Sequence, residues 1–153
     1  MLPEPKIIYE GKGVGNLYLG ISFAEVKNIL GEPEDITHEL SFLWFEDKKH
    51  GHAHYFNLGM IISFKDGKVY QFQFLSNEHN SRYTTFNGKT SKGVQLGDDW
   101  EKAIDIYGDP IAEKFGIDNF AESILKGELR LIGSSEIKFS IKQGKITAIY
   151  VPG

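Results

Sequence analysis

The chain contains no cysteine, which excludes disulfide bonds, thiolate metal ligands and a cysteine nucleophile. No apolar run in it approaches the ~20 residues that a membrane-spanning helix needs. Residues 1–6 lack the basic and apolar segments of a secretory signal. The net charge of −4 at pH 7 gives no general attraction to nucleic acid. These absences predict a cytoplasmic protein that binds neither membranes nor nucleic acids, with secretion after removal of a signal peptide as the alternative.

The composition is that of a folded globular chain rich in aromatic residues. Of its 153 residues, 41% are hydrophobic and 25% are charged, which are ordinary values for a globular domain. The 11 Phe and 7 Tyr favour β-sheet, because aromatic side chains fit a pleated, half-buried surface. The length allows one domain, or two small units that share a core.

One pattern of turn residues occurs twice along the chain. Gly97 lies 77 positions after Gly20 (97 − 20 = 77), and the same offset separates several other glycines and prolines. The pairs that keep this offset are Gly20 and Gly97, Gly31 and Gly108, Pro33 and Pro110, and Gly67 and Gly144. We therefore expect two repeats, at residues 7–76 and 88–153, joined by a linker at 77–87.

Each repeat is expected to begin with a short helix. Ser22 and Glu25 have the spacing of a capping box, Gly31 can end the helix, and Pro33 prevents its continuation. The apolar face of this first helix consists of Phe23, Val26, Ile29 and Leu30. In the second repeat Asp99 takes the place of Ser22, and the apolar face consists of Trp100, Ala103, Ile106 and Tyr107.

Strands with alternating side chains follow each helix. Asp66-Gly67 is a strong two-residue hairpin signal, and Gln143-Gly144 stands in the same place in the second repeat. Period-2 alternation places Tyr70, Phe72 and Phe74 on one face of the strand after Gly67, and Thr147, Ile149 and Val151 match them in the second repeat. The residues assigned to the core under the helices are Met60, Ile62, Phe64, Phe72, Phe74, Ile137, Phe139, Ile141, Ile149 and Val151. The opposite face would carry Ile61, Ser63, Lys65, Gln71, Gln73, Lys138, Ser140, Lys142, Ala148 and Tyr150.

Less regular segments give four further expectations. Residues 7–9 are interpreted as a short edge strand, and residues 83–86 as its counterpart in the second repeat. Residues 47–49 are interpreted as a turn. Residues 118–125 have the pattern of a short helix capped by Asp118. Together the patterns predict an α+β protein of two tandem repeats, each with one or two short helices on an antiparallel β-meander, joined into one curved sheet with the helices on one face.

This arrangement resembles a known family. A helix opened by Leu-Gly-x-Ser/Asp and closed by Gly-Glu/Asp-Pro, followed by a meander with an Asp/Gln-Gly-Lys-Val/Ile hairpin, resembles the repeat of the β-lactamase-inhibitor-protein-like fold. Small outer-membrane assembly lipoproteins of the SmpA/BamE type share that fold with a single repeat. The resemblance covers residues 11–75 and 88–152 and implies a non-catalytic protein that presents a concave sheet to a partner. The chain lacks the disulfides of the inhibitor and the acylated cysteine of the lipoproteins.

Catalytic and metal-binding patterns are sparse. His50, His52 and His54 stand at alternate positions, so that a strand would place them on one face, where two imidazoles can ligate zinc. A third ligand would come from His38, Glu39 or His79; the alternative interpretation is a solvated hairpin. No Gly-x-Ser-x-Gly nucleophile elbow is present, and capping explains the paired carboxylates at positions 98–99. We therefore expect no enzyme and no cofactor.

The leading functional hypothesis is a cytoplasmic inhibitor or immunity protein that captures another protein on the concave sheet. The residues expected to contact the partner are Trp44, Tyr55, Gln71, Gln73, Lys138 and Tyr150. A second hypothesis is a small-ligand or metal sensor that uses the aromatic residues with His52 and His54. A third is a purely structural module, in which the open sheet face is merely solvated.

Overall fold

The computed structural model of the chain describes residues 2–40, 46–109 and 130–152. Within these residues the chain forms two helices and two sheets, consistent with the predicted α+β class. The larger sheet is built from β4 (Asp35–Leu40), β5 (Glu46–Tyr55), β6 (Met60–Lys65), β7 (Lys68–Leu75), β9 (Arg130–Gly133), β10 (Lys138–Lys142) and β11 (Lys145–Val151). The smaller sheet is built from β1 (Lys6–Tyr9), β2 (Gly13–Val14), β3 (Leu17–Tyr18) and β8 (Gly88–Thr90). The helices are α1 (Phe23–Leu30) and α2 (Trp100–Tyr107).

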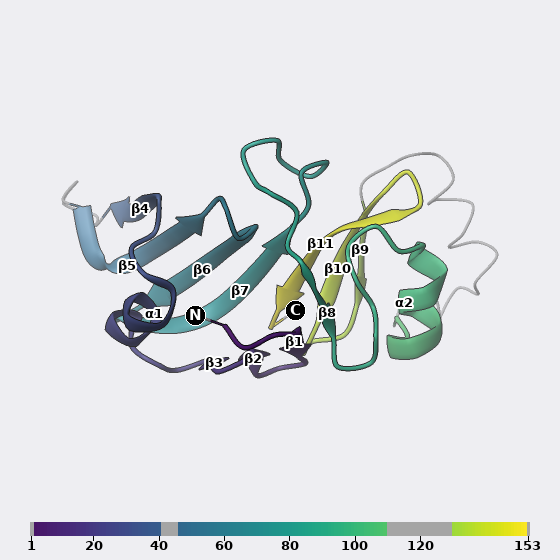
Figure 1. The fold of residues 1–153 in the computed structure, drawn as a ribbon, viewed down its shortest axis with the longest axis horizontal. Helices are drawn as coiled ribbons and strands as arrows, with labels where there is room; N and C mark the ends of the chain where they lie inside the picture. Colours follow the sequence, from purple (N-terminus) through teal and green to yellow (C-terminus); the bar gives the residue numbers. More distant parts are fainter. Residues whose placement is uncertain (1, 41–45, 110–129, 153) are drawn as a thin grey trace.

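The larger sheet joins strands from both halves of the chain. Its order is β4-β5-β6-β7-β11-β10-β9, with antiparallel neighbours throughout the described strands (Figure 1). The two halves meet where β7 pairs with β11, for example at Phe74 and Ile149. The prediction of a single sheet was wrong in one respect, because β1, β2, β3 and β8 form a separate sheet. Strand β1 is also internal to that sheet, pairing with β2 and with β8, and not an edge strand as expected.

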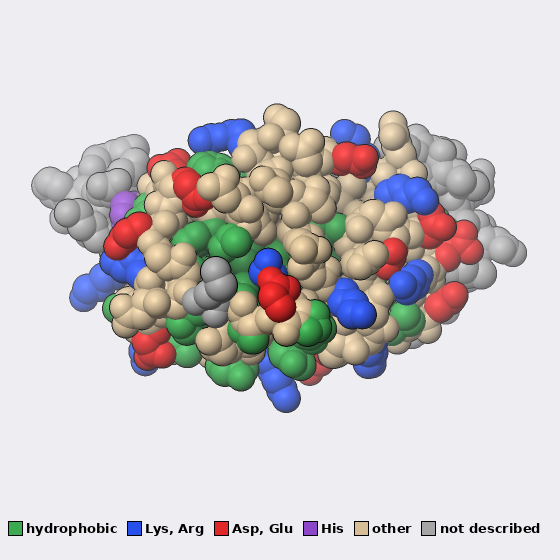
Figure 2. Space-filling view, viewed as in Figure 1, with side chains coloured by type: hydrophobic (Ala, Val, Ile, Leu, Met, Phe, Trp, Pro, Cys, Tyr) green, Lys and Arg blue, Asp and Glu red, His purple; other side chains and the backbone are tan. Residues whose placement is uncertain are grey.

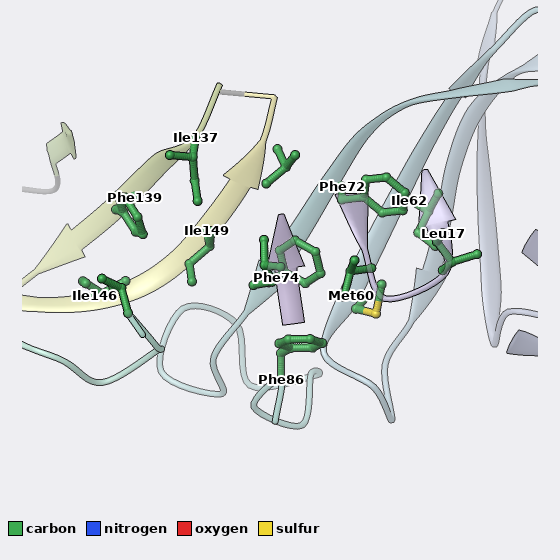
Figure 3. Close-up of a cluster of buried hydrophobic side chains, with 14 of the residues drawn as sticks. Leu17, Met60, Ile62, Phe72, Phe74, Phe86, Ile137, Phe139, Ile146 and Ile149 are labelled. Atoms are coloured by element: carbon green, nitrogen blue, oxygen red, sulfur yellow. The ribbon is translucent and has the colours of Figure 1, made fainter. Parts of the chain in front are cut away.

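The helices and the smaller sheet cover one face of the larger sheet. In Figure 1, α1 and α2 flank the short strands β1, β2, β3 and β8 on the near side of the larger sheet. Phe72, Phe74 and Phe139 are fully buried between these layers, and Leu17 reaches them from β3 (Figure 3). Every residue assigned to the core by alternation is buried. The hydrophobic core therefore lies under the helices, as the alternation predicted.

Backbone hydrogen bonds attach the start of each helix to the strand that returns from a hairpin. The Gly20 N–H donates to the Val69 carbonyl at 2.8 Å, and the Gly97 N–H donates to the Ile146 carbonyl at 2.8 Å. Donor and acceptor are both displaced by 77 positions between the two contacts (97 − 20 = 77; 146 − 69 = 77). Each hairpin turn carries two residues with positive φ, such as Asp66 and Gly67, as a type I′ turn requires.

At two β-bulges the residues of β7 and β11 that face the core differ from those that strict alternation predicts. The register shifts between Ser63 and Phe64, so that Phe64 pairs with Val69. Val69 therefore faces the core, although it was expected on the opposite face, whereas Tyr70, which was expected to share a face with Phe72, is 42% exposed. The shift between Ser140 and Ile141 has the same effect on β11. Ile141 pairs with Ile146, and Ile146, rather than Thr147, joins the apolar cluster. An extra residue in one strand reverses the alternation beyond it.

The helix caps differ between the two helices. The Ser22 hydroxyl accepts a hydrogen bond from the Glu25 N–H at 3.2 Å, which is one half of the predicted capping box. Asp99 occupies the N-cap position of α2, but its carboxylate makes no cap hydrogen bond and instead pairs with Lys145 Nζ at 2.5 Å. The prediction that Asp99 replaces Ser22 therefore holds for position and fails for the contact.

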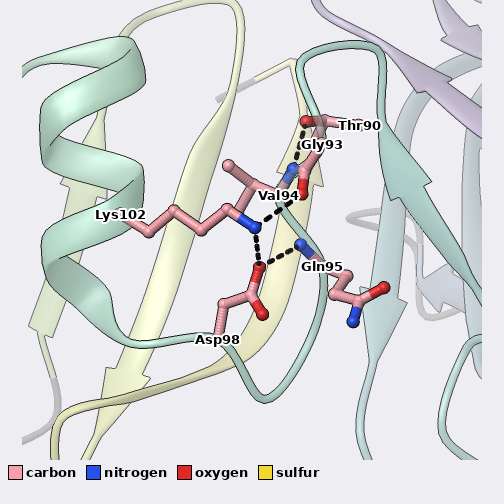
Figure 4. Close-up of polar contacts among 6 residues, drawn as sticks. All are labelled: Thr90, Gly93, Val94, Gln95, Asp98 and Lys102. Carbon is pink, nitrogen blue, oxygen red and sulfur yellow. Dashed lines mark hydrogen bonds and ion pairs between the residues drawn. The ribbon is translucent and has the colours of Figure 1, made fainter.

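A network of polar contacts holds the loop before α2. Asp98 Oδ2 accepts from the Gln95 N–H at 2.9 Å and pairs with Lys102 Nζ at 3.1 Å (Figure 4). Lys102 Nζ also donates to the Gly93 carbonyl at 2.9 Å. The Val94 N–H donates to Thr90 Oγ1 at 3.1 Å. The loop from β8 is thereby fixed to the first turns of α2.

Three predicted segments have different outcomes. Residues 83–86 form no strand; the strand of this region is β8, which pairs in parallel with β1. Residues 47–49 form no turn, because β5 runs through them. The predicted helix at 118–125 lies outside the described residues.

Candidate binding face of the sheet

The larger sheet has a second face, directed away from the helices, which we call the outer face. One position on each of six neighbouring strands forms a continuous cross-strand line over it, which we call the central row. The central row consists of Asp35 on β4, His54 on β5, Ile61 on β6, Gln73 on β7, Tyr150 on β11 and Lys138 on β10. Cross-strand neighbours on one face lie about 5 Å apart, so these side chains form one contiguous surface.

The central row carries opposite charges at its two ends. Asp35 is exposed at the β4 end, and Lys138 is half-buried at the β10 end. Lys138 has no acidic partner among the described residues. Lys142, four residues further along β10, is exposed and adds a second cation at that end. Between the ends the row is neutral, with Gln73 and Tyr150 both half-buried.

Polar side chains next to the central row pair with one another. His52 Nδ1 and Ser63 Oγ lie 2.7 Å apart on β5 and β6. The Gln73 Nε2 group donates to Gln71 Oε1 at 3.4 Å. Ser140 is buried on the same face, and its Oγ has no hydrogen-bond partner among the described residues. This part of the outer face therefore combines paired polar groups with one buried hydroxyl that has no partner among the described residues.

The loop between β7 and β8 packs on part of the outer face. Tyr83 from this loop is buried with Leu75 and Ala148, and Ile61 and Tyr150 pack around them. The Phe56 ring lies 4.8 Å from the Tyr83 ring, and the Arg82 guanidinium lies 4.4 Å from the Phe56 ring centroid. These aromatic residues cover one end of strands β6, β7 and β11. The central row lies at the edge of the covered area, where Ile61 and Tyr150 contact the cluster.

His54 joins this loop to the central row. His54 Nδ1 lies 2.6 Å from the Tyr83 hydroxyl, and its Nε2 lies 3.0 Å from Thr37 Oγ1. Burial lowers the pKa of His54, against the opposing effect of the Asp35 carboxylate. Burial also raises the pKa of Tyr83. At neutral pH the ring is therefore neutral, and the Tyr83 hydroxyl keeps its proton.

The structure separates the residues expected to contact a partner. Gln71, Gln73, Lys138 and Tyr150 lie together on the outer face. Tyr55 lies on the other face of β5, is 2% exposed, and donates its hydroxyl proton to the Gly31 carbonyl at 2.9 Å. The expectation that Tyr55 is available at the open surface was therefore wrong. Trp44 lies outside the described residues.

The histidines of β5 do not assemble a metal site with other described residues. His52 and His54 share the outer face, but Tyr83 and Thr37 contact both ring nitrogens of His54, and Ser63 contacts Nδ1 of His52. Among the described residues there is no group of three histidine, aspartate or glutamate side chains placed to hold a metal ion. The His38 ring makes its contact elsewhere, with the His50 carbonyl at 3.3 Å.

Sequence reasoning missed the aromatic residues of the loop. Tyr83 was assigned to a strand, and Phe56 and Arg82 were given no role. The only available signal was the isolated aromatic residue Tyr83 within a polar stretch, because a loop has no side-chain period to interpret.

Comparisons of the chain with protein-family models, with curated proteins and with solved structures gave no match. Neither helix in the described part of the chain is long and apolar enough to cross a membrane. The candidate site therefore rests on its own geometry.

Proposed function

We propose that this protein is a non-catalytic binding module of inhibitor or immunity type that captures another protein on the outer face. The observation that carries the proposal is the central row, which runs across strands of both halves and is covered by neither of the two described helices. Its half-buried tyrosine and glutamine between charged ends have the character of a wet protein–protein surface. Absence of cysteine is compatible with the reducing cytoplasm, where we place its action.

We further propose that the two halves are tandem repeats of one unit. The matched helix and hairpin contacts, each displaced by 77 positions, support this interpretation. Gln73 and Tyr150 are themselves 77 positions apart (150 − 73 = 77) and pair with each other on β7 and β11. Such self-matched pairing is expected where an approximate two-fold axis passes between the halves. A partner would then sit across the junction of the repeats.

The test is a partner capture followed by measured affinities. The tagged protein is incubated with lysate of its source organism, and a salt-resistant partner is identified by mass spectrometry. Its affinity is then measured for the wild type, for Lys138→Glu, and for a triple variant that adds Gln73→Ala and Tyr150→Ala. We expect the triple variant to lose at least about tenfold in affinity, or about 1.4 kcal/mol, because central aromatic and charged residues dominate interfaces.

A matched control tests whether the loss is specific to the outer face. Lys12→Glu with Tyr18→Ala makes two of the same three kinds of change on the side of the larger sheet that the helices cover, where Tyr18 is 50% exposed. Melting temperatures verify that each variant folds. Equal affinity of the wild type and the triple variant, or an equal loss in the control, would refute the outer face as the binding surface.

A further inference from the structure

A cavity lies beside the C-terminal end of α1, on the side of the molecule opposite to the outer face. Its volume is about 200 Å3, and it opens to solvent. The lining residues are Leu2, Glu4, Lys6, Ile29, Leu30 and Leu58. Figure 2 shows hydrophobic side chains gathered on this side near the N-terminal segment, around one basic and one acidic side chain. The cavity is therefore an apolar pocket with charge at its rim.

The matching region of the second half explains why space remains here. Tyr107, at the end of α2, packs against the Phe139 ring at 5.4 Å and donates its hydroxyl proton to Glu10. The positions 77 residues earlier carry Leu30 and Ile62 (107 − 30 = 77; 139 − 62 = 77), both shorter than the aromatic residues. The end of α1 therefore lacks the ring that occupies this place beside α2.

The two charged side chains at the rim differ in their exposure to solvent. Lys6 Nζ lies 3.1 Å from Glu4 Oε1, but the Lys6 side chain is 17% exposed and the Glu4 side chain is 65% exposed. Lys6 is thus held at the pocket wall, while Glu4 projects into solvent. An exposed ion pair contributes little stability, so another carboxylate can replace Glu4 at Lys6 with small loss.

We propose that this pocket binds a small aliphatic carboxylate of about six carbons. A cavity of about 150 Å3 accommodates benzene, so about 200 Å3 has room for roughly eight non-hydrogen atoms. The alkyl chain contacts Leu30 and Leu58, and the carboxylate pairs with Lys6 in place of Glu4. A ligand of this size binds with an affinity in the range of about 0.1–1 mM.

Three probes of equal chain length test both parts of the site. Hexanoate, hexan-1-ol and hexylamine are titrated into the full chain, and methyl signals of Leu30 and Leu58 are followed by NMR. We expect saturable shifts with hexanoate, at least about fivefold weaker binding of hexan-1-ol, and the weakest binding of hexylamine. Absence of saturable shifts, or tighter binding of hexylamine than of hexanoate, would overturn the proposal.

Variants separate the pocket from the charge. Leu30→Phe introduces a ring at the position that Tyr107 holds in the second half, and we expect at least about tenfold weaker binding of hexanoate and hexan-1-ol alike. Lys6→Met should weaken hexanoate about fivefold without affecting hexan-1-ol, and Glu4→Gln should strengthen hexanoate by removing its competitor. Lys12→Met, at an exposed lysine outside the pocket lining, controls for the loss of one positive charge.

Folding defects are distinguished by a second cavity variant. Leu58→Phe narrows the pocket from the loop between β5 and β6, independently of α1. If Leu30→Phe and Leu58→Phe both keep wild-type melting temperatures and wild-type hexanoate affinity, the pocket is not the binding site. A loss of hexanoate affinity in Lys12→Met equal to that in Lys6→Met would equally overturn the role of Lys6.

Discussion

Ser63 and Ser140 occupy matching positions on the outer face and are expected to respond to the same substitution with opposite signs. They lie 77 positions apart (140 − 63 = 77), each directly before a β-bulge, and both are buried. Ser63 Oγ lies 2.7 Å from His52 Nδ1, whereas Ser140 Oγ has no partner among the described residues. Ser63→Ala therefore removes a hydroxyl that has a hydrogen-bond partner, and Ser140→Ala removes a hydroxyl that has none among the described residues.

The magnitudes follow from the contacts. A buried hydroxyl without a partner costs about 1–3 kcal/mol, so Ser140→Ala should raise the free energy of unfolding by about 1 kcal/mol. Ser63→Ala loses a hydrogen bond worth about 0.5–1.5 kcal/mol and should lower the free energy of unfolding by about 1 kcal/mol. For a chain of this size, each change shifts the melting temperature by about 2–4 °C.

Urea denaturation measures the free energy of unfolding, and equal m-values of wild type and variants are required for the comparison. Scanning calorimetry measures the melting temperature. Burial raises the pKa of Tyr150, and the neighbouring Ser140 side chain opposes that effect, so the Tyr150 hydroxyl is the group to test as a partner of Ser140. A destabilising Ser140→Ala would refute the reasoning, and Tyr150→Phe then identifies the missed partner by producing the same loss. A stabilising Ser63→Ala would refute the role of His52.

Three further predictions concern the core and the loop. Tyr55→Phe removes the hydrogen bond to the Gly31 carbonyl at the end of α1 and should lower the free energy of unfolding by about 1 kcal/mol, measured in urea. Phe74→Ala empties the fully buried centre where both halves meet and should cost about 3–5 kcal/mol, also measured in urea; a loss below 1 kcal/mol would contradict its central packing. His54 has a lowered pKa when folded, so the unfolded chain binds more protons and stability should fall as the pH decreases below about 6.5. His54→Gln should flatten that part of the curve of melting temperature against pH, and an unchanged slope would contradict the assignment.

Local patterns predicted much of the framework. The Asp66-Gly67 hairpin, the short helices and the buried strand residues such as Phe72 depend on side-chain period and turn chemistry, which the sequence displays directly. The bulge that exchanges Val69 for Tyr70 could not be predicted in this way, because alternation continues through an extra residue without a visible break. The parallel pairing of β1 with β8 is non-local and has no signal in either segment.

The candidate site was predictable to the same extent. Gln71, Gln73, Lys138 and Tyr150 share a face because period-2 alternation fixed it on each strand. Tyr55 was assigned to that surface because it lies in the part of the chain where the two repeats differ most, and not because of side-chain alternation. It faces the core. The cover supplied by Tyr83, and the cavity at the end of α1, arise from how loops and termini pack, which no local pattern encodes.

Positions 77 residues apart that carry different side chains indicate which contacts the proposed repeat leaves free to vary. The backbone hydrogen bonds of Gly20 and Gly97 attach a helix to a hairpin strand in the same way in both halves, so they do not distinguish one half from the other. The ends of the central row do distinguish them, because Asp35 gives one end a negative charge and Lys138 gives the other a positive one. A partner with complementary charges would bind in one orientation only, because the reversed orientation places like charges together. The proposed binding mode therefore requires that Lys138→Glu weaken the complex more than Lys138→Ala.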